Sequence, residues 1–216
     1  SMEKESFKPG NMLYPVPAVL VSVADKEGKP NVFTVAWTGT VCSDPPMVSI
    51  SVRPERYSHD MIEETGEFVI NLTNRELAYA TDYCGVKSGR DTDKIKDMKL
   101  TLLKGKEVKA PLIGESPVNI ECKVTQVIEL GSHDMFLAEV TAVLADEKYM
   151  DETGKFDLNK TDMYVARVVA VHADRRYMDK KGKFWLDKAD LMAYSHGSYY
   201  TLGEKIGTFG YSVKKS

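Results

Sequence analysis

Cysteine is scarce in this sequence, and no two cysteines lie close together. Cys42, Cys84 and Cys122 form no C-x-x-C pair, which argues against a disulfide framework and against a cysteine-based zinc site. The four histidines show no metal-ligand spacing either, so we expect no metal ligands. Widely spaced thiols suit a reducing compartment, and we therefore expect a cytoplasmic protein.

Long apolar runs and a large net charge are also absent. The apolar stretch over residues 16–23 is far shorter than the roughly 20 residues of a membrane helix, and no basic segment followed by an apolar one indicates secretion. The net charge of -3 gives no electrostatic basis for binding nucleic acid. We expect neither a membrane nor a nucleic acid as a partner. With 43% hydrophobic residues, the chain can still build a substantial core.

The familiar catalytic motifs are missing as well. No G-x-G-x-x-G follows a strand, and no Walker loop, H-E-x-x-H or G-x-S-x-G occurs. An enzyme with so little acid–base machinery relies on a cofactor for its difficult chemistry. If the chain is an enzyme, we therefore predict that a cofactor carries the reaction and that no side chain is catalytic.

Short β-type runs dominate what is present. They are rich in β-branched residues and are bounded by Gly, Pro, Asn or Asp. A turn over residues 25–31 contains Gly28 and joins the first two runs, and similar turns recur at Gly154 and Gly182. We predict strands over residues 16–23, 32–37, 47–53, 68–72, 118–130, 135–144 and 164–172.

Helices are few, and this sets the expected fold class. Ser58 is expected to cap a short helix that ends at Gly66, and a second helix is expected over residues 75–83, ending at Gly85. Many strands with few helices indicate a mainly β fold closed into a barrel or a sandwich, because open sheet edges invite aggregation.

We predict three segments along the chain. The first is an N-terminal arm over residues 1–11, in which Ser1 is read as a remnant of a cleaved tag. A barrel domain follows over residues 12–189. The glycine- and aromatic-rich end, residues 190–216, is expected to be a tail that packs on the barrel or on a dimer partner.

Four segments carry the strongest signal, and their order along the chain is part of that signal. Their centres read N-V-F-T-V-A-W-T-G-T at 31–40, S-V-R-P-E-R-Y-S at 51–58, S-G-R-D-T-D-K at 88–94 and G-S-H-D at 131–134. Together they resemble the flavin reductase-like family of FMN-binding split barrels, most closely its flavoredoxin-like branch. The resemblance implies a split β-barrel of Greek-key type that binds FMN.

The segment around residues 49–58 suits a phosphate and ribityl cradle. Alternation along a strand places Ser49, Ser51 and Arg53 on one face. Arg56 and Ser58 then fall at a helix start, where free N–H groups and the helix dipole favour an anion. Charge-assisted bonds to a phosphate contribute about 1.5–3 kcal/mol each. The alternative, that the two arginines are surface charges around a turn, stays open.

The segment around residues 31–40 suits the flavin ring. Asn31, Thr34 and Thr38 offer donors and acceptors beside backbone amides. Trp37 would form an amphipathic wall, although composition alone favours a core aromatic. In the family that the sequence resembles, the matching tryptophan lies at the flavin.

The resemblance also assigns roles to residues in the last two segments. It places Lys94 near the ring or the phosphate, where a fixed cation stabilises the anionic reduced flavin. His133 would meet the phosphate or the incoming electron donor, and Cys84 is expected to pack in the core rather than react. The predicted FMN-binding residues are Asn31, Thr34, Trp37, Thr38, Ser51, Arg53, Arg56, Ser58, Ser88, Lys94 and His133.

Two positions depart from the family pattern. Ser132 stands where the family commonly has aspartate, which loosens the inference about ring orientation. Ser58 stands where threonine is frequent, and this change keeps the hydroxyl.

The resemblance implies hydride transfer from NADH or NADPH through FMN to an acceptor, which is free flavin, a ferric complex or a protein. It also implies a homodimer with the site at its interface, over which the tail aromatics would close. Two alternatives remain open. One is a flavoredoxin-type carrier reduced by a redox protein partner, and the other is a flavin-binding module without catalysis.

Overall fold

The computed structural model describes most of the chain as two compact units. One unit comprises Ser1–Pro17 with Tyr164–Lys205, and the other comprises Ala18–Met163 with Ile206–Ser216. No helix within the described part of the chain is both long and apolar enough to cross a membrane. The described residues are 4–11, 13, 16–153, 180–181, 192–195, 198–201 and 203–213. The predicted strand over 164–172, the turns at Gly154 and Gly182 and the predicted domain limits at residues 12 and 189 lie outside them.

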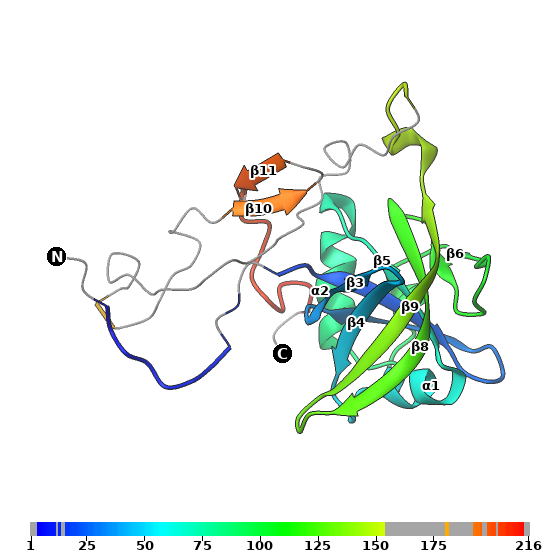
Figure 1. Ribbon diagram of the computed structural model, residues 1–216, viewed down its shortest axis with the longest axis horizontal. Coiled ribbons are helices and arrows are strands. Elements are labelled where there is room, and N and C mark those ends of the chain that lie inside the picture. The colour runs from blue at the N-terminus through cyan, green and yellow to red at the C-terminus, as the bar shows by residue number, and fades with distance from the viewer. Residues whose placement is uncertain are drawn as a thin grey trace. The chain divides into compact units, whose positions relative to one another are not determined.

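A seven-stranded antiparallel sheet forms the frame of the larger unit (Figure 1). Its strands lie in the order β2-β1-β5-β8-β9-β4-β3. Their bounds are β1 Val19–Ala24, β2 Pro30–Val35, β3 Thr38–Ser43, β4 Pro46–Val52, β5 Glu67–Asn71, β8 Val118–Glu129 and β9 Asp134–Ala145. The sheet therefore has β2 at one edge and β3 at the other.

The link between these two edge strands forces the sheet to curl. Only Ala36 and Trp37 separate the end of β2 from the start of β3. Three Cα–Cα steps span at most about 11 Å, whereas the edges of a flat seven-stranded sheet would lie roughly 29 Å apart. The backbone N–H of Ser51 donates to the carbonyl of Trp37 at 2.9 Å and fixes the link against β4. The sheet thus closes on itself as a barrel with a seam at this link.

One face of the curled sheet encloses the main core. Its members come from strands at both ends of the strand order and pack in a single cluster with Met61 and Ile62 of helix α1. Buried side chains of this cluster include Val21 of β1, Phe33 of β2, Ile50 of β4, Phe68 of β5 and Phe136 of β9. Strands β2 and β4 share this core although four strands lie between them in the sheet order, as expected for a barrel.

A second layer covers the outer side of β1 and β2. Leu20 and Val32 pack there against Leu77, Ala80 and Cys84 of the helical segment. This explains why every residue of β1 is buried, since both faces of that strand are covered. The remaining elements are η1 Arg75–Leu77, α2 Ala78–Val86, α3 Lys94–Asp97, β6 Leu102–Leu103, β7 Leu112–Ile113, η2 Glu147–Tyr149, β10 Met192–Ser195 and β11 Ser198–Thr201.

Six of the predicted strands coincide with β1, β2, β4, β5, β8 and β9, and their ends shift by up to three residues. The turn at Gly28, which has a φ of 85°, joins β1 and β2 as predicted. The edge strand β3 was not predicted. Its sequence, Thr-Gly-Thr-Val-Cys-Ser, is largely exposed and has no alternation of apolar residues. Only its pairing with β4 reveals it as a strand.

Helix α1, Tyr57–Thr65, begins two residues earlier than predicted. Its N-cap is Arg56, which makes no side-chain capping bond, so the assignment of Ser58 as the cap is wrong. Ser58 lies inside the first turn, where its hydroxyl accepts a hydrogen bond from Asn31 at 2.7 Å. The predicted end at Gly66 is confirmed, because Gly66 has a φ of 67° and its N–H donates to the carbonyl of Ile62 at 2.8 Å.

Helix α2 continues past its predicted end. Gly85 lies inside the helix, which extends to Val86 and is capped by Lys87. An added Cβ at Gly85 would lie 3.2 Å from Cβ of Thr34, so this glycine serves close packing of α2 on β2 instead of ending the helix. The predicted stop at Gly85 is therefore wrong.

The C-terminal residues of the larger unit are held on α2. The carboxylate of Asp82 accepts the N–H of Gly210 at 2.7 Å and that of Ser212 at 3.0 Å, and the Ser212 hydroxyl also contacts it. Tyr79 donates its hydroxyl to the carbonyl of Ser212 at 2.6 Å and packs edge-on against Tyr211. Helix α2 thus contacts residues 210–212 on one side and β2 on the other.

Gly66→Ala should destabilise the protein by about 1–2 kcal/mol, because alanine resists the left-handed conformation at this position. Nothing lies within 4 Å of the added Cβ, so the effect isolates backbone strain. Urea unfolding of the variant and the parent measures it. Gly39→Ala is the matched control, since its Cβ also meets open space but its φ is not positive. Equal loss in both variants would contradict the assignment of Gly66.

Candidate functional site

Two adjoining cavities lie at the seam of the barrel, beside the link between β2 and β3. They share Phe33 and Arg56. The first has a volume of about 240 Å³ and is lined by Phe33, Thr34, Val35, Ala36, Trp37, Ser51, Val52, Arg53, Arg56, Gly85 and His133. The second has a volume of about 170 Å³ and is lined by Asn31, Phe33, Glu55, Arg56, Tyr57, Ser58, Lys87, Ser88, Gly89, Arg90 and Lys94.

These cavities bring together every predicted site residue except Thr38. The hydroxyl of Thr38 donates to the carbonyl of Ser49 at 2.8 Å and holds β3 to β4. The hydroxyl of Thr34 lines the first cavity and is bonded to the carbonyl of Thr81 on α2. Both threonines therefore already support the backbone around the seam.

An aromatic wall closes one side of the first cavity. The rings of Trp37 and His133 lie 4.4 Å apart between centroids, at an interplanar angle of 38°. Trp37 is 40% exposed, so it is not a core aromatic, and its assignment to the flavin stays a prediction. Burial and then the charge of Arg53 lower the pKa of His133, which leaves its ring neutral at pH 7. Its Nδ1 lies 2.9 Å from the Ser132 hydroxyl.

Polar side chains from three elements meet in the second cavity. Asn31 of β2 is 5% exposed and donates to Ser58 of α1, which is 1% exposed. The loop that follows α2 lies against this pair. An added Cβ at Gly89 would come within 2.6 Å of both the Asn31 side chain and the Tyr57 ring, so only glycine allows this approach.

Two cations, the half-buried Arg56 and the buried Lys94, lie against the carboxyl end of α2. Arg56 donates to the carbonyls of Gly85 at 3.3 Å and Cys84 at 3.4 Å. Lys94, which is 2% exposed, donates to the carbonyls of Cys84 at 3.1 Å and Lys87 at 3.2 Å. These carbonyls carry the negative end of the helix dipole, which favours cations there.

The electrostatics of these cations favour an incoming anion. Burial lowers the pKa of Arg56 and lowers that of Lys94 to about 8, with the charge of Arg56 adding to the effect on Lys94. Within the described part of the chain, neither cation forms an ion pair with a carboxylate. The positive charge of these cations is therefore not neutralised by a described carboxylate, and an anionic group beside the buried Lys94 would be strongly stabilised.

Sequence reasoning missed Arg90, Tyr57 and Phe33. The guanidinium of Arg90 lies 5.5 Å from the Tyr57 ring centroid and donates to the carbonyl of Glu55 at 2.9 Å. Arg56 lies 5.6 Å from the ring centroid of Phe33. The only signal for Arg90 was its place between Ser88 and Lys94 in a segment already singled out.

A third and larger cavity, of about 710 Å³, adjoins the second. The two share Asn31, Tyr57, Gly89, Arg90 and Lys94. Its charged lining consists of the cations Lys29, Arg90, Lys94, Lys96 and Lys99 and the anions Asp91 and Asp93. The excess of cations extends the positive character of the site beyond the first two cavities.

Cys84 is not a reactive thiol in this setting. It is fully buried, and burial raises its pKa to about 11, against the lowering effects of Lys94 and Arg56. A thiol that stays protonated at neutral pH is a poor nucleophile. The prediction that Cys84 packs in the core is confirmed.

The chain is similar in sequence to a known domain family and to an archaeal protein. The model of the flavin reductase-like domain matches residues 11–203. An uncharacterized protein of Archaeoglobus fulgidus is 35% identical over 147 residues, which make up 68% of this chain and 81% of that protein.

Solved structures show the same fold. The flavoredoxin of Desulfovibrio vulgaris (Miyazaki F) has a TM-score of 0.71 and 30% identity, covering 97% of this chain and 98% of its own. A split barrel domain protein of Shewanella frigidimarina NCIMB 400 has a TM-score of 0.63 and 20% identity, and the match covers 91% of this chain and 86% of that one. At this identity the match shows a shared fold only. The predicted mainly β split barrel is thereby confirmed.

Ser58→Ala should destabilise the protein by about 1–3 kcal/mol, because the buried Asn31 amide loses its acceptor. Denaturant unfolding with constant slope measures the change. Ser132→Ala removes a hydroxyl that bonds on the exposed hairpin turn, and its effect should stay within about 0.5 kcal/mol. If the two variants are equally stable, the Asn31–Ser58 bond does not hold β2 to α1.

Proposed function

The chain belongs to the flavin reductase-like family, and we propose that it binds FMN across the two adjoining cavities and transfers electrons through it. The observation that carries this proposal is the division of the site. One compartment has an aromatic wall, and the other has the buried Lys94 and the half-buried Arg56, neither of which pairs with a carboxylate among the described residues. A flat heterocycle joined to a phosphate matches both.

The first cavity would hold the isoalloxazine ring. The Trp37–His133 wall offers the faces of two aromatic rings, and a neutral imidazole adds no charge beside the flavin. The backbone of the Val35–Trp37 link borders the same cavity and supplies polar groups for the ring edge. Ser51 and Arg53 line the opposite strand and would complete the polar contacts.

The second cavity would hold the phosphate and the ribityl chain. A phosphate monoester carries nearly two negative charges above pH 7. Arg56 and Lys94 would neutralise it, with the hydroxyls of Ser58 and Ser88 as further partners. Each charge-assisted bond contributes about 1.5–3 kcal/mol before desolvation is subtracted.

Bound FMN would supply hydride and electron transfer, so the protein needs no acid–base residue of its own. Its side chains position the ring between the wall and β4, exclude water at the seam and place positive charge nearby. Lys94 and Arg56 would stabilise added negative charge on the ring or hold the phosphate.

We propose NADH or NADPH as the electron donor and free flavin, a ferric complex or a protein as the acceptor. The large cavity with its excess of cations supports a donor that carries phosphates. The alternative is a flavoredoxin-type carrier reduced by a partner protein, and it is favoured by the near-complete match to a flavoredoxin at 30% identity.

A homodimer is part of the proposal. Large apolar side chains are exposed on three strands of the sheet, with exposures of 50% at Val41 of β3, 41% at Val127 of β8 and 62% at Val143 of β9. Burial of these side chains against a second copy would favour association. We also propose a cytoplasmic location, which the free thiols of Cys42, Cys84 and Cys122 support.

An absorbance titration of the purified chain with FMN, followed by anaerobic addition of NADH or NADPH, tests the function. We expect a shifted flavin spectrum that saturates at one FMN per chain, then bleaching by the donor. Saturation without bleaching would exclude the NAD(P)H-dependent reductase and leave the carrier and the non-catalytic module. The absence of any spectral change would overturn flavin binding altogether.

Flavin affinity should fall as the pH rises above about 8. Lys94 is protonated below its pKa of about 8 and loses its charge above it, and a phosphate binds the charged form. The dissociation constant for FMN should rise about tenfold between pH 7 and pH 9, because the charged fraction of Lys94 falls by that factor. Fluorescence quenching of FMN at each pH gives the constants.

Lys94→Arg is the control, because a guanidinium stays charged across this range. The variant should show a flat pH profile even if its affinity is lower. If the dissociation constant of the parent protein is equally independent of pH, Lys94 does not bind the phosphate.

A further inference from the structure

A buried histidine on α1 is surrounded by carboxylates outside the proposed flavin site. His59 is 4% exposed, and its Nε2 lies 2.8 Å from Oδ2 of Asp134 on β9. Its other ring nitrogen, Nδ1, lies 3.6 Å from Oδ1 of Asp60 and 3.9 Å from Oε2 of Glu63. This Nδ1 is buried and has no hydrogen-bond partner among the residues that the structure describes.

The bond to Asp134 explains the state of the ring. An ionised carboxylate can only accept a hydrogen bond. Nε2 of His59 must therefore carry the proton and donate it in the bond to Asp134. In the neutral imidazole the lone pair then resides on Nδ1, which faces Asp60 and Glu63. Histidines that bind metals in proteins typically donate their second N–H to a carboxylate in this way.

We propose that His59, Asp60 and Glu63 bind a divalent transition-metal ion, with water in the remaining positions. Their ligand atoms all lie within 4.8 Å of one another. Around a tetrahedral ion with bonds of about 2 Å, ligand atoms lie roughly 3.3 Å apart. The carboxylates can close this difference, because the Asp60 side chain is 82% exposed and that of Glu63 is 49% exposed.

The donor set selects the class of ion. One imidazole nitrogen with two carboxylate oxygens suits Zn²⁺, Co²⁺ or Mn²⁺. Mg²⁺ and Ca²⁺ prefer oxygen ligands throughout and would bind more weakly. A solvated acidic cluster would explain Asp60 and Glu63 alone, but it leaves the buried Nδ1 without a partner.

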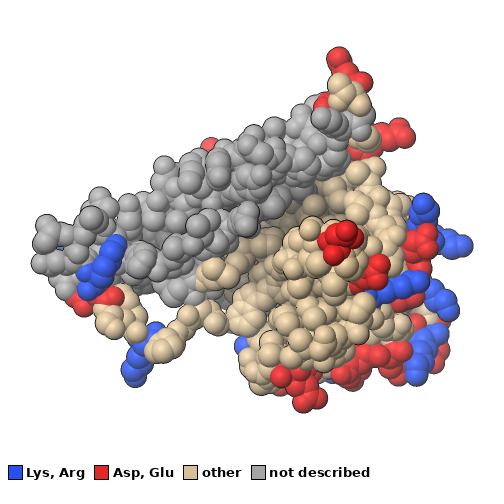
Figure 2. All heavy atoms as spheres, viewed as in Figure 1, with Lys and Arg blue, Asp and Glu red and all other residues tan. Residues whose placement is uncertain are grey.

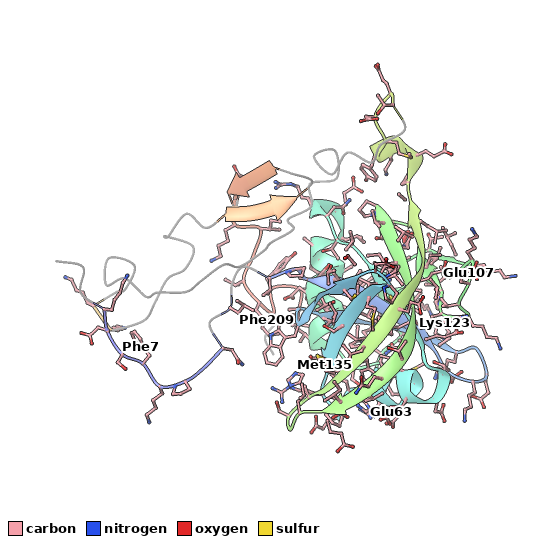
Figure 3. All side chains as sticks on the ribbon, viewed as in Figure 1. Phe7, Glu63, Glu107, Lys123, Met135 and Phe209 are labelled. Atoms are coloured by element: carbon pink, nitrogen blue, oxygen red, sulfur yellow. The ribbon has the colours of Figure 1, made fainter. Side chains whose placement is uncertain are left out.

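The site lies on the acidic side of α1. Figure 2 shows carboxylates along the lower edge of this unit, where Figure 1 places α1. Figure 3 labels Glu63 beside the same helix, and Met135, the residue after Asp134, on β9. An ion there would brace α1, whose N-terminal end carries Arg56 and Ser58 of the proposed flavin site, against β9 through Asp134. The sequence alone does not reveal this site, because it contains one histidine and no cysteine.

Titration of the chelator-treated full chain with Co²⁺ tests the proposal, with visible absorption and calorimetry as readouts. We expect one Co²⁺ per chain and competition by Zn²⁺. Glu63→Gln and Asp60→Asn should each weaken binding at least tenfold. Asp134→Asn should weaken it about 10–100-fold, because it disturbs the orientation and basicity of the histidine.

Glu64→Gln is the matched control, since it makes the same change on the next residue of the helix, where the carboxylate lies 3.7 Å from Lys26. Its affinity should stay within threefold of the parent. Failure of the parent to bind Co²⁺, or equal weakening by Glu64→Gln, would overturn the site. Far-UV circular dichroism confirms that each variant is folded. The assay contains no flavin, so its result is independent of the proposed function.

Discussion

The short connection between the two edge strands is the constraint on which the rest of this structure depends. Because Ala36 and Trp37 alone join β2 to β3, the sheet cannot lie flat, and its apolar face must turn inward around one core. The same connection leaves a seam where backbone, Trp37 and the end of β4 come together. The same short connection therefore both closes the barrel and forms the site.

Around that seam, helix ends and loops supply the polar groups that a barrel wall lacks. Helix α1 brings Arg56 and Ser58, the carboxyl end of α2 gathers the cations, and the loop with Gly89 closes the second cavity. The strands form a rigid scaffold, and the helix ends and loops that follow them supply most of the polar side chains, as is usual for functional sites.

Much of this could be predicted from the sequence, because the strands alternate and the site residues cluster in short segments. Two kinds of feature could not. Strand β3 has too few apolar residues to be recognised as a strand from the sequence, and it is defined by its pairing with β4. The role of Ser58 depends on Asn31, which lies 27 residues away, and that of His59 depends on Asp134, 75 residues away. Such long-range partners leave no local pattern.

The hold of the α2 carbonyls on Arg56 and Lys94 has a consequence for ligand choice. In the free protein these cations already bind the negative end of a helix, so an arriving molecule must replace those bonds with stronger ones. A dianionic group can do so, whereas an uncharged sugar alcohol offers no better partner than the peptide oxygens it displaces. If Arg56 and Lys94 hold the phosphate as proposed, the end of α2 competes with the ligand for both cations, and this competition would favour phosphorylated flavins over riboflavin.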